Sequence, residues 1–378
     1  MIRSLFSSTT SASVSALHRM LDVSVQLAPT HRNQFVNHLP MALHALSDLG
    51  ATPERMQAFS TQYLLDHEVA DAPAPATAPA DWLALQGQMN AFAPLRAYFE
   101  QAQSSEGADV LLHRVLPDLL AGLASGAFHG VIRVAHAVQG GHPGELACAL
   151  AYWAGCWEML APPRTLGAIP AATATTTAAP GLLRFDEWTS RLMVVARNWH
   201  SDGRSITAQM EDASHTPMYQ EMAGALAPLA TTHDRVEELA RLALAIYIGS
   251  GDFTAIHMIT GLRALRVLLP WIENPEPLQS VLVHAVTAAC LVSQAPYASR
   301  QVTYRRADWS SVMLAAIASN DAHVIKLVHA CREEAAAYGE PSYLDAAALA
   351  LGWAVGPSHL RTPEPRQGVA VRNGLSER

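Results

Sequence analysis

The 378-residue sequence has few charged residues and no long apolar run. Charged residues make up 15% of the chain, against roughly 25% in an ordinary soluble domain, while half of the residues are hydrophobic. This composition can bury a large core, which excludes a wholly disordered chain. No apolar run approaches the roughly 18 residues that are needed to cross a bilayer, so we expect no membrane association.

Cysteine and basic charge are also scarce. The four cysteines are scattered through helix-like segments, without the C-x-x-C spacing of a zinc or redox motif. This usage favours a reducing compartment. The net charge of −8 leaves no broad basic face for nucleic acid. We therefore expect a cytoplasmic protein without a nucleic-acid partner, and the sequence does not indicate its oligomeric state.

Lysine is nearly absent, because Lys326 is the only lysine among 25 Lys and Arg residues. It lies in an apolar stretch, three residues after His323 and on the same face of an expected helix. An arginine would reach solvent from a helix equally well, but only lysine can lose its proton when it is buried. A neutral amine can act as a base, form a Schiff base, or react with carbon dioxide to give an anionic carbamate that can bind a metal.

Apolar residues recur at helical spacing through most of the chain. Leu239, Leu242 and Ile246 illustrate the period. There is no clear strand-turn-strand pattern and no Asn-Gly hairpin signal. The sequence therefore predicts an all-α protein with a single large multi-helical domain.

Composition divides the chain into three parts. Residues 1–28 form an N-terminal segment that we expect to be partly flexible, and residues 29–357 form the helical domain. Within this domain, residues 160–180 are rich in Pro, Thr and Ala and predict a long internal loop. Residues 358–378 show no apolar period and predict a flexible tail. Candidate functional residues lie both before and after this loop, which favours a single domain over two.

Histidine is the most unusual component, with 17 residues. Each buried imidazole needs a hydrogen-bonding partner, and several protonated rings in one core would repel one another. A metal removes both difficulties because it binds the neutral ring. The alternative is a set of hydrogen-bonded core histidines. Eight histidines lie in apolar helical stretches: His38, His44, His129, His136, His257, His284, His323 and His329.

The spacing of these histidines limits which of them can share one centre. His129 and His136 are seven apart and lie on one helix face, whereas His38 and His44 are six apart and point in different directions. No H-E-x-x-H motif and no paired E-x-x-H motif is present. The excess of histidine over nearby carboxylates favours Fe, Zn, Cu or Ni over Ca or Mg.

Five short segments follow one another along the chain: NHLPMAL at 37–43, LGA at 49–51, AFHGVIR at 127–133, DFTAIHMITG at 252–261 and AHVIK at 322–326. In this order and rough spacing they resemble the questin oxidase-like family, which is associated with oxidative opening of anthraquinone-type rings in polyketide pathways. The resemblance covers most of the chain, from about residue 30 to about residue 355.

The resemblance implies an all-helical oxygenase that uses a mononuclear non-haem Fe(II) and dioxygen. Carried over by motif, its metal ligands are His38, His129, His257, His323 and a Lys326 carboxylated by carbon dioxide. The expected reaction is Baeyer–Villiger-type oxygen insertion, or ring C–C cleavage, on an aromatic ketone or quinone of polyketide origin. Where a reductant is needed, NADPH is the expected external one. The chain has no G-x-G-x-x-G fingerprint, so the reductant would be bound in an unfamiliar way or delivered by a partner.

Other residues near the motifs are assigned more loosely. Arg133 is a candidate catalytic residue that orients a substrate oxygen or pairs with the carbamate, with a plain structural role as the alternative. The histidines outside the motifs are interpreted as supporting or packing residues, and His136 is the favoured neighbour of His129. Fungal family members tend to carry a histidine where this chain has Met41, and the 160–180 loop has no counterpart that we can place.

Two other functions remain open from the sequence. A metal-dependent hydrolase could also use a carboxylated lysine, although the Asp-rich ligand set of such sites is missing. A non-catalytic helical binding protein could contain the same histidines as core residues. Four aromatic side chains are candidates for a substrate pocket, although such residues at helical spacing are more often core: Trp153, Trp157, Tyr247 and Phe253.

Overall fold

The computed structural model describes residues 3–32, 35–162, 182–293, 303–304 and 307–355. The all-α prediction is confirmed. In the described residues, sixteen α-helices follow one another: α1 (Arg3–Ser24), α2 (Leu39–Leu49), α3 (Pro53–Asp66), α4 (Phe92–Glu106), α5 (Ala108–Leu120), α6 (His129–Gly140), α7 (Pro143–Gly155), α8 (Phe185–Ala196), α9 (Ile206–Ser214), α10 (Pro217–Ala223), α11 (Thr232–Ser250), α12 (Phe253–Leu268), α13 (Leu278–Ser293), α14 (Trp309–Ala318), α15 (Ala322–Tyr338) and α16 (Ser342–Ala350).

Four short strands add two small ladders that the sequence did not predict. Each ladder has two antiparallel strands, and neither contributes a sheet to the core. The strands are β1 (Leu27–His31), β2 (Val69–Asp71), β3 (Thr303–Tyr304) and β4 (Ala354–Val355), and three 3-10 turns cover Leu83–Leu85, Met89–Ala91 and Leu269–Trp271.

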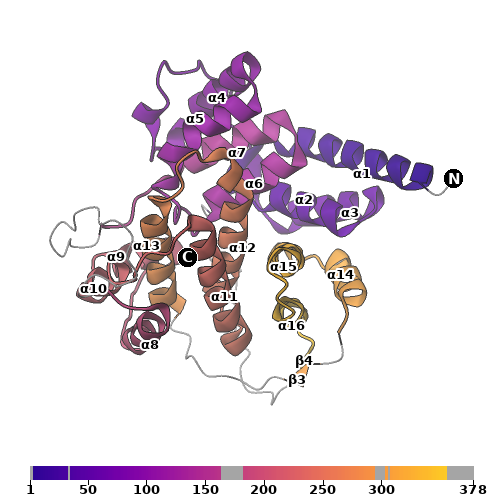
Figure 1. Cartoon of the computed structure of the whole chain (residues 1–378). Helices are drawn as coiled ribbons and strands as arrows, with labels where there is room; N and C mark the ends of the chain where they lie inside the picture. The colour runs from indigo at the N-terminus through magenta and orange to yellow at the C-terminus, as the bar shows by residue number, and fades with distance from the viewer. Residues whose placement is uncertain (1–2, 33–34, 163–181, 294–302, 305–306, 356–378) are drawn as a thin grey trace, which may run out of the picture.

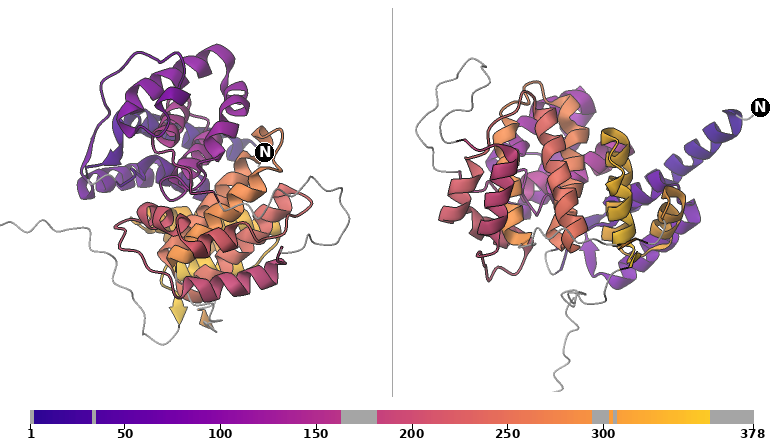
Figure 2. Two further views of the ribbon diagram at one scale, coloured as in Figure 1. Left: turned by 90° about the vertical axis from the view of Figure 1, so that its left-hand side faces the viewer. Right: turned by 60° about the horizontal axis from the view of Figure 1, so that its bottom comes forward.

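The helices surround a central ring of four. Helix α2 packs on α6 and α15, and α12 packs on the same two helices, so that α2, α6, α12 and α15 contact one another in a closed circuit. Figure 1 shows α4, α5 and α7 above this ring, α11 and α13 beside α12, and α16 and α14 beside α15. Both views in Figure 2 show α1 leading to the N-terminus of the chain. The ring brings together elements that are far apart in the sequence.

Two of the four ring helices, α12 and α15, begin at side-chain caps. The Asp252 carboxylate accepts the backbone N–H of Ala255 at 3.0 Å, which starts α12. Asp321 starts α15 by accepting the backbone N–H of His323 at 2.7 Å. Side-chain caps of this kind satisfy donors that a helix start leaves unpaired. The caps therefore fix the positions of the first turns, where the candidate ligands lie.

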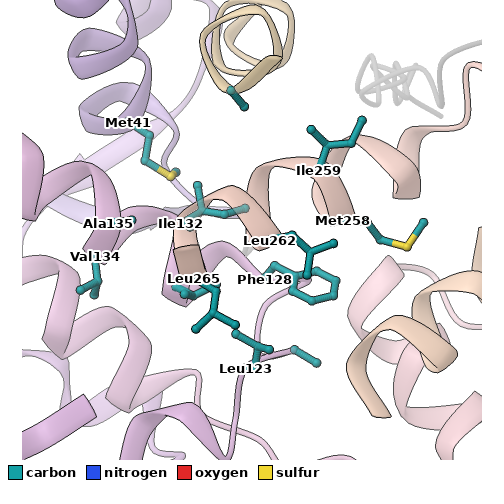
Figure 3. Close-up of a cluster of buried hydrophobic side chains, with 14 of the residues drawn as sticks. Met41, Leu123, Phe128, Ile132, Val134, Ala135, Met258, Ile259, Leu262 and Leu265 are labelled. Carbon is teal, nitrogen blue, oxygen red and sulfur yellow. The ribbon is translucent and has the colours of Figure 1, made fainter. Parts of the chain in front are cut away.

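A tightly packed core lies between α2, α6 and α12. Figure 3 shows Met41, Ile132, Phe128 and Leu262 among its buried side chains. A Cβ added at Gly261 would come within 2.9 Å of Phe128, so α12 and the start of α6 approach each other closely there. Met41 is thus a core residue here, at the position where fungal family members tend to have histidine.

The three expected parts of the chain are covered unequally by the structure. Helix α1 lies in the segment 1–28 that we expected to be partly flexible. Most of the 160–180 loop and the whole 358–378 tail lie outside the described residues. None of the helices in the described part of the chain combines the length and the hydropathy that a membrane span requires.

Candidate metal centre

The four histidines of the family motifs converge where the ring helices begin. His38 is the N-cap of α2, His129 is the first residue of α6, and His323 is the second residue of α15. His257 lies one turn into α12. The N-terminal ends of helices carry partial positive charge, so this convergence keeps the imidazoles in their neutral form and favours an anion beside them.

His38 and His129 face each other most closely. Their Nε2 atoms are 2.8 Å apart. One ring nitrogen of each of His38, His129 and His323 lies within 4.8 Å of the others, which is a spacing that one metal ion can bridge. The structure therefore brings together three of the four histidines that the family resemblance implied as ligands.

The turn before α6 is strained in a way that orients His129. Gly126, Ala127 and Phe128 all have left-handed backbone conformations, with φ of 58°, 54° and 68°. For residues with a Cβ this conformation costs roughly 1–2 kcal/mol each. The turn places the Gly126 carbonyl 2.6 Å from His129 Nδ1, which must donate because a carbonyl oxygen can only accept. The Nε2 atom of His129 therefore carries the lone pair, which can accept the hydrogen bond from His38 Nε2 or bind a cation.

His257 repeats this arrangement. Its Nδ1 donates to the Phe253 carbonyl one turn earlier, at 3.0 Å, which leaves Nε2 without a proton. The His257 ring lies 4.8 Å from that of His129 and 5.7 Å from that of His323, measured between centroids. His257 is thus part of the cluster, on the side of α12.

His323 completes the cluster on the side of α15. Its ring lies 4.5 Å from that of His38. Its Nδ1 is 3.7 Å from the carboxylate of Asp321, the residue that caps the same helix. His38 and His323 are half-buried, whereas His129 and His257 are buried, so the cluster can be approached from the His38 and His323 side.

Lys326 lies one turn beyond His323 and is only 2% exposed. Burial lowers its pKa to about 7, against a smaller opposing effect of Asp321. A substantial fraction of the amine is therefore neutral near pH 7, and only the neutral amine can react with carbon dioxide. An arginine could not provide this form, which is consistent with the unusual choice of lysine here.

The imidazoles of the cluster are neutral as well. Burial, followed by the charges of Lys326 and neighbouring histidines, lowers the pKa of His38 and His323 well below its usual value. Burial lowers the pKa of His129 well below its usual value, and that of His257 to about 4. Neutral rings expose the lone pairs that a metal needs.

This donor set fits a transition-metal ion. In metal sites, a ligating histidine usually donates its other ring N–H to a carbonyl or carboxylate, which fixes the ring and its tautomer. His129 and His257 do this through Gly126 and Phe253, and His323 has Asp321 beside its Nδ1. Imidazole nitrogen suits iron, zinc or copper. The residues present therefore fit the iron that the family resemblance implies.

Tyr63 supports the cluster, and sequence reasoning missed it. Its hydroxyl accepts the backbone N–H of His38 at 2.8 Å and is hydrogen-bonded to His31 Nε2 at 2.8 Å. The ring of His67 stacks on that of Tyr63 at 4.2 Å. Nothing in the spacing of these residues indicated that α3 would lie against His38.

Arg133 is held by a carboxylate of the protein. Its Nε and one terminal nitrogen donate to the two Glu145 oxygens at 2.7 and 2.9 Å, and both side chains are buried. The other terminal nitrogen has no partner in the described residues. The catalytic role that we predicted for Arg133 stays a prediction, and the structure adds Glu145 as its partner.

Three of the remaining core histidines form a cluster of their own. His44, His136 and His329 lie together with Asp48, in a group separate from the four motif histidines. His136 therefore contacts His44 and His329, although it shares a helix face with His129. His284 lies apart from both clusters, half-buried beside Ser280 and Tyr219.

The aromatic candidates have different environments. Trp153 and Tyr247 are buried core residues, and Trp157 is half-buried. Phe253 is 49% exposed, and its ring lies 4.9 Å from that of His257 and 4.8 Å from that of His323. Phe253 is thus the one candidate with an exposed ring against the histidine cluster.

Sequence comparison agrees with the motifs. The family model described as questin oxidase-like matches residues 35–331, which is most of the chain and includes all four clustered histidines and Lys326. The match confirms the resemblance drawn from the five segments. No curated protein shows significant similarity to the chain.

Proposed function

Because the chain belongs to the questin oxidase-like family, and is therefore an oxidoreductase associated with polyketide metabolism, we propose that it is a non-haem iron oxygenase. The observation that carries the proposal is the convergence of four neutral imidazoles beside a buried lysine at the starts of four helices. The proposed reaction is oxygen insertion next to a carbonyl, or ring C–C cleavage, on an aromatic ketone or quinone.

In this proposal, His38, His129, His257 and His323 hold Fe(II), together with a carbamate on Lys326. The neutral Lys326 amine attacks carbon dioxide, the new N–C bond forms, and one proton leaves to solvent. The resulting anion is favoured by the positive ends of the ring helices and supplies negative charge to a ligand set that contains no Asp or Glu. Bound iron would supply the activation of dioxygen.

The protein's own contribution is orientation and exclusion of water. The carbonyls of Gly126 and Phe253 hold two imidazoles in fixed orientations, and Tyr63 holds the backbone at His38. Ring cleavage that incorporates both oxygen atoms needs no reductant. Insertion of one oxygen atom requires two further electrons to reduce the other to water, and NADPH is the reductant that we propose for that case.

Iron analysis and oxygen uptake test the function directly. We expect about one iron per chain bound by the cluster, and oxygen uptake with anthraquinones or related aromatic ketones that is lost with a chelator and restored by Fe(II). A stable protein with no iron-dependent uptake would contradict the proposal. Hydrolysis by the zinc-loaded protein without oxygen consumption would instead support the hydrolase alternative.

Phe253 is the side chain that we propose contacts the substrate, because its exposed ring lies against two of the ligand candidates. A planar aromatic substrate that reaches the cluster from this side can stack on it. Replacing Phe253 with leucine should raise the KM for the aromatic substrate by about threefold to tenfold, the equivalent of one lost aromatic pair. The iron content should not change.

The matched control is Phe253→Tyr, which keeps an aromatic ring at the same place. This variant should retain the KM of the parent protein. An unchanged KM in Phe253→Leu, or equal losses in both variants, would show that substrate does not stack on residue 253.

A further inference from the structure

The three helices α2, α6 and α15 each carry two core histidines, not one. The second member of each pair follows the first by six or seven residues: His38 and His44, His129 and His136, His323 and His329. At 1.5 Å per residue, this spacing is about 9–10 Å along a helix. One ion cannot bridge two clusters that far apart, so the second cluster needs its own explanation.

The second cluster has the geometry of a metal site. His44 Nδ1 lies 3.4 Å from Asp48 Oδ2 and 3.1 Å from His136 Nδ1. His329 Nε2 lies 3.0 Å from the same Asp48 oxygen. When metal–ligand bonds are 2.0–2.2 Å long, neighbouring ligands of a tetrahedron lie roughly 3.3–3.6 Å apart. The observed separations are close to these values, so little movement would be needed to enclose an ion.

The charges around the cluster also favour a cation. Asp48 and Glu333 are two carboxylates, with the Glu333 oxygen 3.8 Å from His329 Nε2. The one buried guanidinium nearby, Arg263, donates to Glu333 and to Gln139. Arg263 therefore offsets one of the two carboxylate charges, and a bound divalent ion would offset the other.

An ion can reach the cluster from solvent. The three imidazoles are buried, but the Asp48 side chain is 40% exposed. His44 and Asp48 are one turn apart on α2, so the carboxylate lies at the outer edge of the histidines. An ion could therefore enter past Asp48 without local unfolding of the ring.

We propose that His44, Asp48 and His329, whose ligand atoms all lie within 4.8 Å of one another, form a second metal site that binds a divalent ion of the zinc type. His136, whose Nδ1 lies 3.1 Å from His44 Nδ1, is the fourth donor and has to move toward the other three. Three imidazoles and one carboxylate then fill the four positions of a tetrahedral zinc ion and leave none for a substrate. The ion joins α2, α6 and α15, the same helices that carry three ligands of the first cluster. Its role is to fix their relative positions.

Zinc binding to a protein whose first cluster has lost His129 tests this proposal, and the outcome does not depend on the oxygenase function. In the full chain carrying His129→Gln, stripped with a chelator and titrated with Zn²⁺ alone, we expect about one bound equivalent and a zinc-dependent rise in Tm. Adding Asp48→Asn and His329→Gln should weaken this binding by about 100-fold or more and remove the rise in Tm.

The matched control is His284→Gln in the same His129→Gln background, because His284 lies outside both clusters. This control should bind zinc as its parent does. Far-ultraviolet circular dichroism of each metal-free variant establishes that it is folded. Equal zinc binding with and without Asp48 and His329, or no zinc binding by the folded His129→Gln protein, would overturn the proposal and leave a hydrogen-bonded network only.

Discussion

Replacing Lys326 with arginine is expected to abolish iron binding and to lower iron-dependent oxygen uptake by at least about 100-fold. Arginine keeps its charge in a protein, so it cannot react with carbon dioxide. It also adds a permanent positive charge beside four imidazoles, which repels a metal cation. The loss should appear in metal analysis of the purified variant, before any assay of activity.

The control for Lys326→Arg is a substitution elsewhere on α15 that also exchanges lysine and arginine. Arg332 lies on α15 with its side chain exposed, and Arg332→Lys should retain iron and oxygen uptake. Iron content in Lys326→Arg equal to that of the parent protein would exclude the carbamate as a ligand.

The scarcity of lysine makes the carbamate directly observable. Lys326 is the only lysine, so a ¹³C-bicarbonate-labelled carbamate signal can come only from this residue or from the N-terminal amine. The signal of Lys326 should disappear in Lys326→Arg, while that of the N-terminus remains. Because burial holds the Lys326 pKa at about 7, carbamate formation should also decline as the pH falls below 7 and the amine becomes protonated.

The family motifs predicted the first cluster because each motif histidine begins, or nearly begins, a ring helix. Sequence alone could not show why these four meet, because 272 residues separate the end of α2 at Leu49 from the start of α15 at Ala322, and the pairing of the helices is set by tertiary packing. The neutral state of Lys326 could be suspected from its apolar neighbours, and its burial supports that interpretation.

The second cluster shows where spacing misleads. His129 and His136 lie on one helix face, from which we inferred that they serve one centre. Seven residues are two full turns, however, so a shared face places them in successive layers about 10 Å apart. Only its spacing of four residues from His44 indicated in the sequence that Asp48 could belong to a site. On three helices, a second histidine follows the first after six or seven residues. This repeated spacing was the sequence pattern that could have revealed a second layer of histidines.

The pairing of Arg133 with Glu145 could not be predicted from the sequence either, because Glu145 lies on the next helix. Helices α6 and α7 pack side by side, which buries both residues to 3% exposure of their side chains. From the sequence, Glu145 was an ordinary first-turn carboxylate, of the kind that favours a helix start. Only the packing turns it into the counter-ion of a buried guanidinium.

Replacing Glu145 with leucine should lower the free energy of unfolding by about 3–5 kcal/mol, because it leaves the Arg133 charge buried without a counter-ion. The double variant Arg133→Leu with Glu145→Leu removes both charges and should recover most of that loss. Urea-induced unfolding of the metal-free variants measures both effects. The double variant also tests catalysis by Arg133, since a folded, iron-loaded protein without oxygen uptake would support the predicted role.

An exposed ion pair on the surface of the protein is the control for the buried pair of Arg133 and Glu145. Arg191 and Glu187 are joined at the same 2.7 Å, but their side chains are 54% and 51% exposed. In water such a pair contributes little, so Glu187→Leu should change the free energy of unfolding by less than about 1 kcal/mol. If Glu145→Leu cost no more than Glu187→Leu, the buried guanidinium would have to be neutralised by some other group, and the stabilising role of Glu145 would be wrong.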